Sequence, residues 1–213
     1  MKIDDPNLAK FLMHEIFTTD CYKLKPLLGK PIDTIIDIGA NNGFFAVYAR
    51  VLFPTAKIVC FEPCPDTFAR LSDNVANLNI ECRNIGLGDG TPITMKRNSH
   101  TGDSGSFIGV AGGDIPTKTF TDLVADLSIT ANTIVKIDCE GGERFLVKSD
   151  EQCNTLAKAG RWMMEVHYSQ KLWPGCPPRE FYELFWHAFA AKYNFGMSGA
   201  YKRQYGLIVA DKK

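Results

Sequence analysis

The sequence predicts a single α/β domain built on a doubly wound, mostly parallel sheet. Short apolar runs that suit buried strands alternate with segments whose apolar residues recur at helical spacing. Strands that are apolar throughout are typical of a parallel sheet with helices on both faces. The length of 213 residues fits one domain, so we expect one unit over residues 1–213.

The N-terminal half is expected to alternate strands and helices behind a helical cap. Residues 1–30 form this cap, because the apolar side chains within residues 6–18 share one helical face. Pro54 ends the first helix of the alternating series, and Pro65 suits the first turn of the second. We expect strands over residues 32–38, 57–61 and 79–87, and helices that begin at residues 44 and 65.

Residues 88–118 interrupt this order, since they are rich in glycine and contain two short β-like pieces. Residues 93–97 and 106–110 predict a hairpin excursion over one edge of the sheet. The alternation then resumes with a helix that a capping box of Thr119 and Asp122 begins. We expect strands over residues 133–138 and 161–166, helices that start near residues 143 and 178, and a C-terminal antiparallel hairpin of residues 193–197 and 205–210.

The composition excludes some classes of function. Lys plus Arg number 24 and Asp plus Glu number 24, which argues against a protein that binds nucleic acid by neutralising phosphates and against a polybasic membrane patch. No apolar run approaches the ~18 residues of a membrane span, and the first residues lack the layout of a signal peptide. Seven cysteines, an odd number, favour a reduced, cytoplasmic interior.

In an open α/β sheet, ligands bind outside the carboxyl ends of the strands, so the polar residues there are informative. The first strand ends in Asp37-Ile-Gly39-Ala40-Asn41-Asn42-Gly43, a glycine turn into a helix whose amides favour an anion. Asn41 stands where dinucleotide folds have their second glycine, which disfavours NAD or FAD. Burial of Asp37 is costly unless it accepts hydrogen bonds from the turn amides or from a ligand ammonium.

Glu62 and Pro63 end the second strand. A carboxylate at this place can accept hydrogen bonds from both ribose hydroxyls of a nucleoside, and Pro63 can flank the base. A solvated turn glutamate is the alternative.

Acidic side chains and one histidine gather at the ends of the fourth and fifth strands. Asp138 and Glu140 suit ammonium binding, proton transfer or a hard metal ion, while Glu143 is explained by a helix N-terminus. Glu165 and His167 end the fifth strand, and His167 is either a general base or a structural histidine. Cys60 and Cys64 have no second ligand pair at zinc spacing, so no metal site is expected there.

Together these residues resemble the FkbM family of class I S-adenosylmethionine-dependent methyltransferases over about residues 32–168. Five ordered motifs carry the resemblance: residues 36–43, residues 61–65, Lys118-Thr-Phe-Thr-Asp122, residues 135–143 and Glu165-Val-His167. Gly142 departs from the family pattern, which usually has Ala there.

The resemblance implies a Rossmann-like sheet of seven strands that binds S-adenosylmethionine. It implies that the methionine part lies over Asp37, Gly39, Ala40, Asn41 and Gly43, that Glu62 holds the ribose beside Pro63, and that Asn84, Ile85, Gly86 and Asp89 lie beside adenine. It also implies that Asp138 faces the methionine end of the cofactor and the acceptor. Methyl transfer to a hydroxyl oxygen of a small molecule or sugar is the implied reaction.

Two routes for the acceptor proton stay open, because Asp138, Glu140, Glu165 and His167 come from neighbouring strand ends. In one, His167 is the base, with Asp138 or Glu140 as second candidates. In the other, Asp138 and Glu165 hold a divalent cation such as Mg²⁺. Residues 98–114, which include His100, are expected to be a mobile cover over the acceptor. The alternatives to a methyltransferase are a non-catalytic nucleoside-binding module and a NAD-dependent oxidoreductase.

Overall fold

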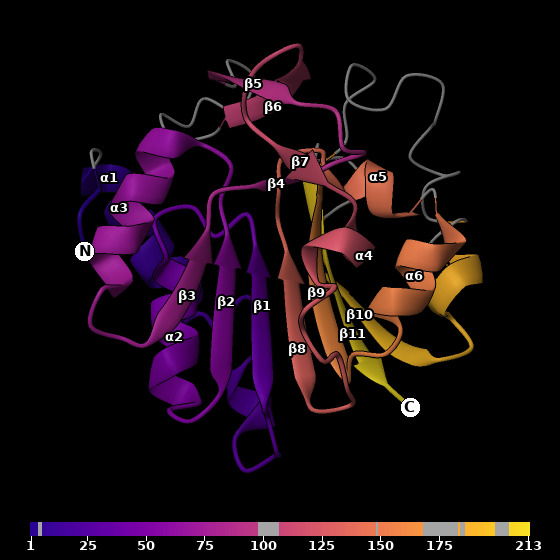
Figure 1. Cartoon of the computed structure of the whole chain (residues 1–213). Coiled ribbons are helices and arrows are strands. Elements are labelled where there is room, and N and C mark those ends of the chain that lie inside the picture. Colours follow the sequence, from indigo (N-terminus) through magenta and orange to yellow (C-terminus); the bar gives the residue numbers. More distant parts are fainter. Residues whose placement is uncertain (4–5, 98–106, 148, 168–182, 184–185, 199–204) are drawn as a thin grey trace.

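The computed structural model describes residues 1–3, 6–97, 107–147, 149–167, 183, 186–198 and 205–213. A seven-stranded sheet in the order β10-β11-β9-β8-β1-β2-β3 forms its centre (Figure 1). The strands of this sheet are β1 Thr34–Ile38, β2 Lys57–Phe61, β3 Ile80–Arg83, β8 Thr133–Ile137, β9 Arg161–His167, β10 Tyr193–Ser198 and β11 Tyr205–Lys212.

The strand directions confirm the predicted fold class. Strands β3, β2, β1, β8 and β9 pair in parallel, whereas β11 runs antiparallel to both β9 and β10. The expected C-terminal hairpin is therefore present. The chain passes from β1 outwards to β3 and later returns to β8 on the other side of β1, so the strand order reverses between β1 and β8. Ligands of doubly wound sheets bind at such a switch point.

Helices cover both faces of the sheet (Figure 1). On one side lie α1 Pro6–Leu12, α2 Phe44–Leu52 and α3 Pro65–Val75, and on the other lie α4 Phe120–Leu123, α5 Glu143–Val147 and α6 Asp150–Leu156. Strand alternation divides the core between them: Ile35 packs with α2 in one cluster, while Ile36 and Ile38 belong to the other. Among the described residues no helix is long and apolar enough to cross a bilayer.

The N-terminal helix differs from the single helix predicted for residues 6–18. After Leu12 the chain widens into a π-helix, Met13–Thr18, and a short 3₁₀ helix, Lys25–Leu27, follows. π-helical turns are rare and are frequent at functional sites.

The predicted third strand, residues 79–87, is divided in the structure. It ends at Arg83, the Ile85 amide donates back to the Arg83 carbonyl, and Gly86–Leu87 (β4) pairs with Thr117–Lys118 (β7) in a separate sheet. The hairpin predicted within residues 88–118 is present as β5 Ile93–Arg97 antiparallel to β6 Phe107–Ala111. It lies above the carboxyl ends of the central strands (Figure 1).

The later helices are only partly comparable with the prediction. The helix that Thr119 begins has four residues, and the Thr119 hydroxyl accepts from the Asp122 amide, as a capping box requires. The predicted helix that starts at Pro178 lies largely outside the described residues. The described part of it, residues 183 and 186–189, is helical.

Candidate active site at the carboxyl ends of the strands

Two adjoining pockets lie at the carboxyl ends of β1, β2 and β8. The first, named here the hairpin pocket, has a volume of about 330 Å³ and lies below β5 and β6. The second, named the acidic pocket, has a volume of about 200 Å³ and is lined by Asp138, Glu140, Glu165 and His167. Five residues line both pockets, so they form one continuous cleft: Gly39, Pro63, Met95, Cys139 and Glu140.

The glycine turn after β1 forms the bridge between the pockets. Gly39 has a φ of 75°, and a Cβ built on it would lie 1.8 Å from the Asp138 carbonyl oxygen. Only glycine therefore allows β1 and β8 to approach here. Asn41 also has a positive φ, of 51°, a conformation that asparagine tolerates better than most residues. The turn thus presents backbone, rather than side chains, to the cleft.

Glu62 is held across this turn by two backbone amides. Its Oε2 accepts from the Asn41 amide and its Oε1 from the Cys64 amide, both at 2.9 Å. The side chain is buried, and burial raises its pKa to about 7, against the opposing effect of the two donors. Each carboxylate oxygen keeps a second lone pair, so Glu62 is already oriented to accept from two ligand hydroxyls.

Asp37 lies behind the cleft rather than in it. It is completely buried, and its Oδ1 lies 3.1 Å from Nζ of Lys136. Its expected partners, the turn amides, bond elsewhere: those of Gly39 and Ala40 donate to the Phe61 carbonyl. Burial raises the pKa of Asp37, and the Lys136 ammonium opposes this effect.

Lys136 connects Asp37 to the acidic pocket. Its ammonium donates to the Gly39 carbonyl oxygen at 2.7 Å and lies 3.6 Å from Oδ2 of Asp138. Although burial disfavours the ammonium, the neighbouring Asp37 and Asp138 carboxylates raise its pKa, so Lys136 is a permanent cation. The same Asp138 oxygen accepts from the Tyr22 hydroxyl at 3.0 Å.

His167 faces three carboxylates across the acidic pocket. Its Nε2 lies 3.6 Å from Glu140 Oε2, 3.8 Å from Glu165 Oε1 and 3.9 Å from Asp138 Oδ1. Burial raises the pKa of Glu165 to about 8, and the Asp138 charge adds to this effect. In the described part of the chain, no group of three or more His, Cys, Asp or Glu side chains has the geometry of a metal site.

Glu143 holds the opposite nitrogen of His167. It is completely buried at the start of α5, and its oxygens accept from the amides of Cys139 at 3.0 Å and Gly141 at 2.9 Å. Its Oε1 also lies 3.1 Å from Nδ1 of His167. Burial opposes the imidazolium, but the carboxylates of Glu143, Glu140 and Asp138 outweigh it and raise the His167 pKa to about 10. His167 is therefore protonated at neutral pH.

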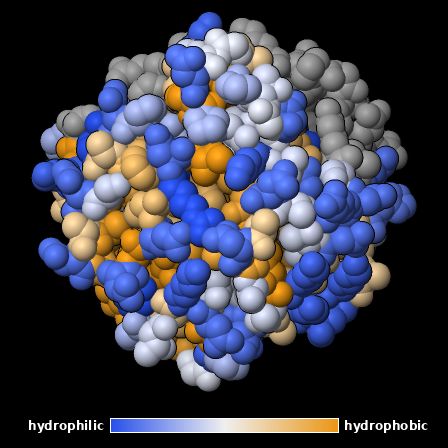
Figure 2. Space-filling model, in the orientation of Figure 1, coloured by the Kyte–Doolittle hydropathy of each residue, from blue (hydrophilic) through white to orange (hydrophobic). Residues whose placement is uncertain are grey.

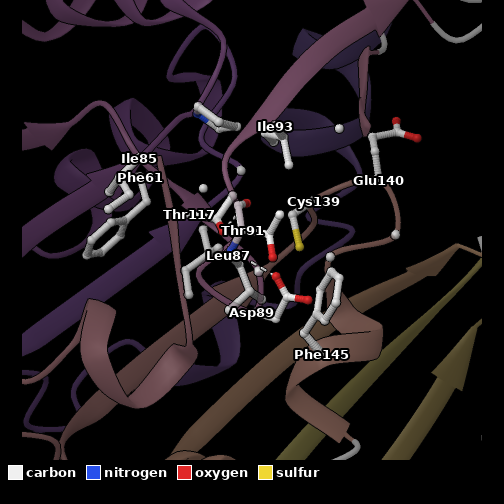
Figure 3. A pocket seen from close by; sticks show the side chains of 18 of the residues that line it. Phe61, Ile85, Leu87, Asp89, Thr91, Ile93, Thr117, Cys139, Glu140 and Phe145 are labelled. Atoms are coloured by element: carbon white, nitrogen blue, oxygen red, sulfur yellow. Dashed lines mark hydrogen bonds between the residues drawn. The ribbon is translucent and has the colours of Figure 1, made fainter. Parts of the chain in front are cut away.

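The hairpin pocket combines apolar and polar groups, with Asp89, Thr91 and Thr117 among its lining residues. Ile85, Gly86, Leu87 and Asp89 line it from the segment that follows β3. In Figure 3, Phe61 and Ile85 lie on one side of this pocket and Glu140 on the opposite side, with Ile93 of the hairpin above them. On the molecular surface, hydrophobic side chains gather below the hairpin between hydrophilic ones (Figure 2). The pocket therefore suits a flat group with apolar faces and polar edges, such as a nucleobase.

The structure brings most of the predicted site residues to the cleft. Twelve of them line one or both pockets: Gly39, Ala40, Asn41, Glu62, Pro63, Ile85, Gly86, Asp89, Asp138, Glu140, Glu165 and His167. Gly43, Asn84 and Asp37 are not among the lining residues. Gly43 instead packs against Leu71. The side-chain amide of Asn84 donates to the backbone carbonyl oxygens of Glu62 and Pro63. His100 lies outside the described residues.

Several lining or supporting residues were not predicted. Tyr22 lies outside the five motifs, Lys136 lies within the motif of residues 135–143 but was given no role, and Glu143 was attributed to a helix N-terminus. Cys139, which stands between Asp138 and Glu140 in the chain, also lines both pockets. The chain leaves the strand geometry after Ile137, because Glu140 and Gly141 adopt φ values of 51° and 104°.

The comparisons with known proteins agree with this geometry. The family model described as "Methyltransferase FkbM domain" matches residues 37–193. The methyltransferase sdnD of Sordaria araneosa is 29% identical over 68% of this chain and 70% of its own length. The 31-O-demethyl-FK506 methyltransferase FkbM of Streptomyces tacrolimicus is 37% identical over 35% of this chain and 29% of its own length. The hexuronic acid methyltransferase AglP of Haloferax volcanii is 26% identical over 63% of this chain and 56% of its own length.

Solved structures share the fold at low sequence identity. A putative rRNA methylase from Clostridium thermocellum has a TM-score of 0.54 with 9% identity, over 100% of this chain and 98% of that one. Fibrillarin of Aeropyrum pernix with bound S-adenosylmethionine has a TM-score of 0.50 with 14% identity, over 91% of this chain and 74% of that one.

The family match and the fold identify an S-adenosylmethionine-dependent methyltransferase. Within this class, the chain belongs to the FkbM methyltransferase family. The matches span less than two thirds of FkbM and of AglP, so their activities bear on this chain only as support for a proposal.

Proposed function

We propose that this protein transfers the methyl group of S-adenosylmethionine to a hydroxyl oxygen of a small-molecule or glycan acceptor. The observation that carries the proposal is the orientation of Glu62. Two amides hold its carboxylate beside the glycine turn and next to the hairpin pocket, which is the arrangement that a ribose with its base requires. Two relatives are named as methyltransferases of 31-O-demethyl-FK506 and of a hexuronic acid. These names support an oxygen as the atom that is methylated and a small molecule or sugar as the acceptor.

The cofactor is assigned to the cleft as follows. The base occupies the hairpin pocket beside Ile85, Gly86 and Asp89, and Glu62, which lines the acidic pocket where the two pockets join, accepts from the two ribose hydroxyls. The methionine part crosses Gly39 into the acidic pocket, where Asp138 and Glu140 attract its ammonium or its sulfonium. When bound, S-adenosylmethionine supplies an activated methyl group. The chain has to align the acceptor oxygen with that methyl and to remove its proton.

A carboxylate is the better candidate for proton removal than His167. The carboxylates around His167 stabilise its imidazolium, and a protonated histidine accepts no proton. Glu165, with a pKa raised to about 8 beside Asp138, is suited to general-base catalysis near neutral pH. We therefore assign proton removal to Glu165, with Asp138 and Glu140 as neighbours that favour proton uptake. His167 balances the negative charge.

Binding experiments test the proposal against its alternatives. Isothermal titration should show S-adenosylhomocysteine binding and no binding of NADH, whereas the reverse result would favour an oxidoreductase. A mass-resolved screen for products 14 Da heavier should then show methyl transfer. S-adenosylhomocysteine binding without any transfer would support the non-catalytic module.

We also propose a cytoplasmic location without nucleic-acid or membrane partners. The support is the balanced charge of the sequence and the free thiols of the six described cysteines. Fractionation of the source cells tests this location. A thiol-reactive label, added before the cells are lysed, records the oxidation state of the cysteines in the native protein. Oxidised cysteines in the native protein would contradict it.

A further inference from the structure

One wall of the acidic pocket comes from the N-terminal segment, residues 6–22, which lies outside the residues that the family model matches. Three of its lining side chains are apolar and belong to α1: Leu8, Phe11 and Leu12. Glu15 and Ile16 of the π-helix continue the wall, and Tyr22 completes it. Asp138, Glu140, Glu165 and His167 line the pocket from the strand ends. The wall that residues 6–22 supply is therefore mainly apolar, with one carboxylate, Glu15, on it.

The end of this segment is firmly anchored to the domain. Ile16, Tyr22 and Leu24 are buried in the core cluster that also contains Phe45, and the Tyr22 ring packs edge-on against Phe45 at 5.2 Å. Asp20, which adopts a positive φ of 51°, accepts from the Leu24 amide at 2.9 Å. These contacts fix the position of the segment relative to the strands.

Tyr22 also ties the segment to the reacting end of the cleft. Its hydroxyl donates to Oδ2 of Asp138 at 3.0 Å. Burial raises the pKa of Tyr22 well above its ordinary value, so the hydroxyl remains a donor. With Lys136 near the same oxygen, Oδ2 of Asp138 is occupied, and its other oxygen, Oδ1, lies on the side of His167.

The α1 helix, in contrast, has no buried residue. Phe11 is 57% exposed, and Leu8 and Leu12 are half-buried. Apolar side chains that line a pocket next to a reaction site gain free energy when a ligand covers them, at about 25 cal/mol per Å² of apolar surface. The apolar wall is continuous with the cleft that Glu62 and Gly39 line.

We infer that residues 6–22 build the acceptor subsite: Leu8, Phe11 and Leu12 bind an apolar portion of the acceptor, and Tyr22 fixes Asp138 beside its reacting hydroxyl. The acceptor is thus an amphipathic molecule, an apolar body with a hydroxyl, rather than a free sugar. This inference rests on the proposed function, because it assigns the cofactor to the rest of the cleft.

Two glucosides test the apolar wall. The full chain, saturated with S-adenosylhomocysteine, is titrated with n-octyl β-D-glucopyranoside below its micelle concentration and with methyl β-D-glucopyranoside. The two probes share their hydroxyls and differ in the apolar tail. We expect the octyl probe to bind at least tenfold more tightly than the methyl probe.

Two surface variants locate the binding. Phe11→Ser should weaken the octyl probe at least fivefold and leave the affinity for S-adenosylhomocysteine unchanged. Val51→Ser is the matched control, since Val51 is 67% exposed on α2 and does not line the pocket, and it should change neither affinity. Thermal melts of both variants check that the fold is retained.

The outcomes separate this inference from the proposed function. Equal affinity for the two glucosides, no binding of either, or equal effects of Phe11→Ser and Val51→Ser would overturn the apolar subsite. A parallel loss of S-adenosylhomocysteine binding in Phe11→Ser would overturn it too, because the segment would then serve the cofactor. Failure of wild-type protein to bind S-adenosylhomocysteine would instead count against the proposed function.

Discussion

Nδ1 of His167 lies 3.1 Å from Oε1 of Glu143, a completely buried carboxylate that two backbone amides also hold. A buried carboxylate is stable only when it is paired, and the imidazolium of His167 supplies the charge. The second nitrogen of the ring then faces Asp138, Glu140 and Glu165 as a cation. The pair accordingly controls the charge of the acidic pocket, and it has consequences for stability as well as for catalysis.

The stability of the fold should decrease as the pH rises from 8 to 10. The folded-state pKa of His167, about 10, lies above its unfolded value near 6.5, so its stabilisation is complete below pH 6.5 and is lost as the pH approaches 10. The pKa of Glu165 is raised to about 8, so the contribution of its protonated form to stability is lost between pH 4.5 and 8. Above pH 8, His167 is therefore the member of this cluster whose titration changes stability most. The contribution of His167 to the free energy of unfolding, taken as the difference between wild type and His167→Asn in urea, should fall by up to about 2.5 kcal/mol between pH 8 and 10, since one pKa unit is worth about 1.36 kcal/mol.

His167→Asn is the matched variant for this measurement, because it keeps a polar side chain without the charge. Its free energy of unfolding should depend on pH much less steeply over the same interval. Equal slopes in wild type and variant would show that His167 is not the titrating group.

Cofactor affinity should depend on Glu62. Glu62→Ala removes the acceptor of two ribose hydroxyls, and charge-assisted hydrogen bonds are worth about 1.5–3 kcal/mol. We expect calorimetry to show S-adenosylhomocysteine binding at least tenfold more weakly. Glu81→Ala is the control, since Glu81 pairs with Arg83 on the surface of β3, away from both pockets. An unchanged affinity in Glu62→Ala would remove this residue from the cofactor site.

Removal of the Tyr22 hydroxyl should impair turnover more than folding. Tyr22→Phe deletes one donor to Asp138 and leaves the ring contact with Phe45 in place. The matched control is Tyr193→Phe, which removes a buried hydroxyl that donates to the Ala159 carbonyl at 2.6 Å, away from the cleft. Both variants should lose about 1 kcal/mol of stability. Only Tyr22→Phe should lower kcat, by about tenfold, and shift the acid limb of its pH profile upwards; similar kinetics in the two would contradict the assignment.

The glycine-rich connection between β5 and β6 remains a predicted cover. Ile93 and Met95 of the described hairpin line the cleft, so the hairpin that carries this connection borders the site. Deletion of residues 101–106, replaced by a two-residue turn, should reduce turnover at least tenfold and change S-adenosylhomocysteine affinity less than threefold. Equal losses of both, or of neither, would exclude a cover over the acceptor.

The sequence predicted the parts of the site that local chemistry determines. The glycine turn, Glu62 and the acids after β8 each stand at a strand end, where periodicity alone locates them. Lys136 was not predicted because it lies within a strand, where a lysine normally points to solvent, and only the pairing of β1 with β8 brings it to Asp37. Tyr22 was not predicted either, since its contact with Asp138 joins residues 116 positions apart.

The protonation states were the least predictable feature. An isolated histidine has a pKa near 6.5 and looks like a general base. Four carboxylates surround His167, three of them from residues 138–143 and one from β9, and their combined charge depends on the packing of β8, β9 and α5. No local pattern around His167 contains this information.

The identity of the proton acceptor gives the most decisive test of the mechanism. If Glu165 takes the proton, kcat/KM should rise with pH through a limb near pH 8, whereas a histidine with an ordinary pKa would place this limb near pH 6.5. Glu165→Gln should lower kcat by at least a hundredfold, as expected for loss of a general base. His167→Lys, which keeps a cation among the carboxylates, should retain more activity than His167→Asn.

A metal-assisted route predicts a different pattern. If Asp138 and Glu165 held a divalent cation, excess EDTA would abolish turnover and Mg²⁺ would restore it. Because Lys136 and His167 already supply two positive charges to these carboxylates, we expect full activity in EDTA. Loss of activity in EDTA with rescue by Mg²⁺ would reassign the carboxylates as metal ligands. In the variant series, equal losses of activity in His167→Lys, His167→Asn and His167→Ala would instead identify His167 as the base.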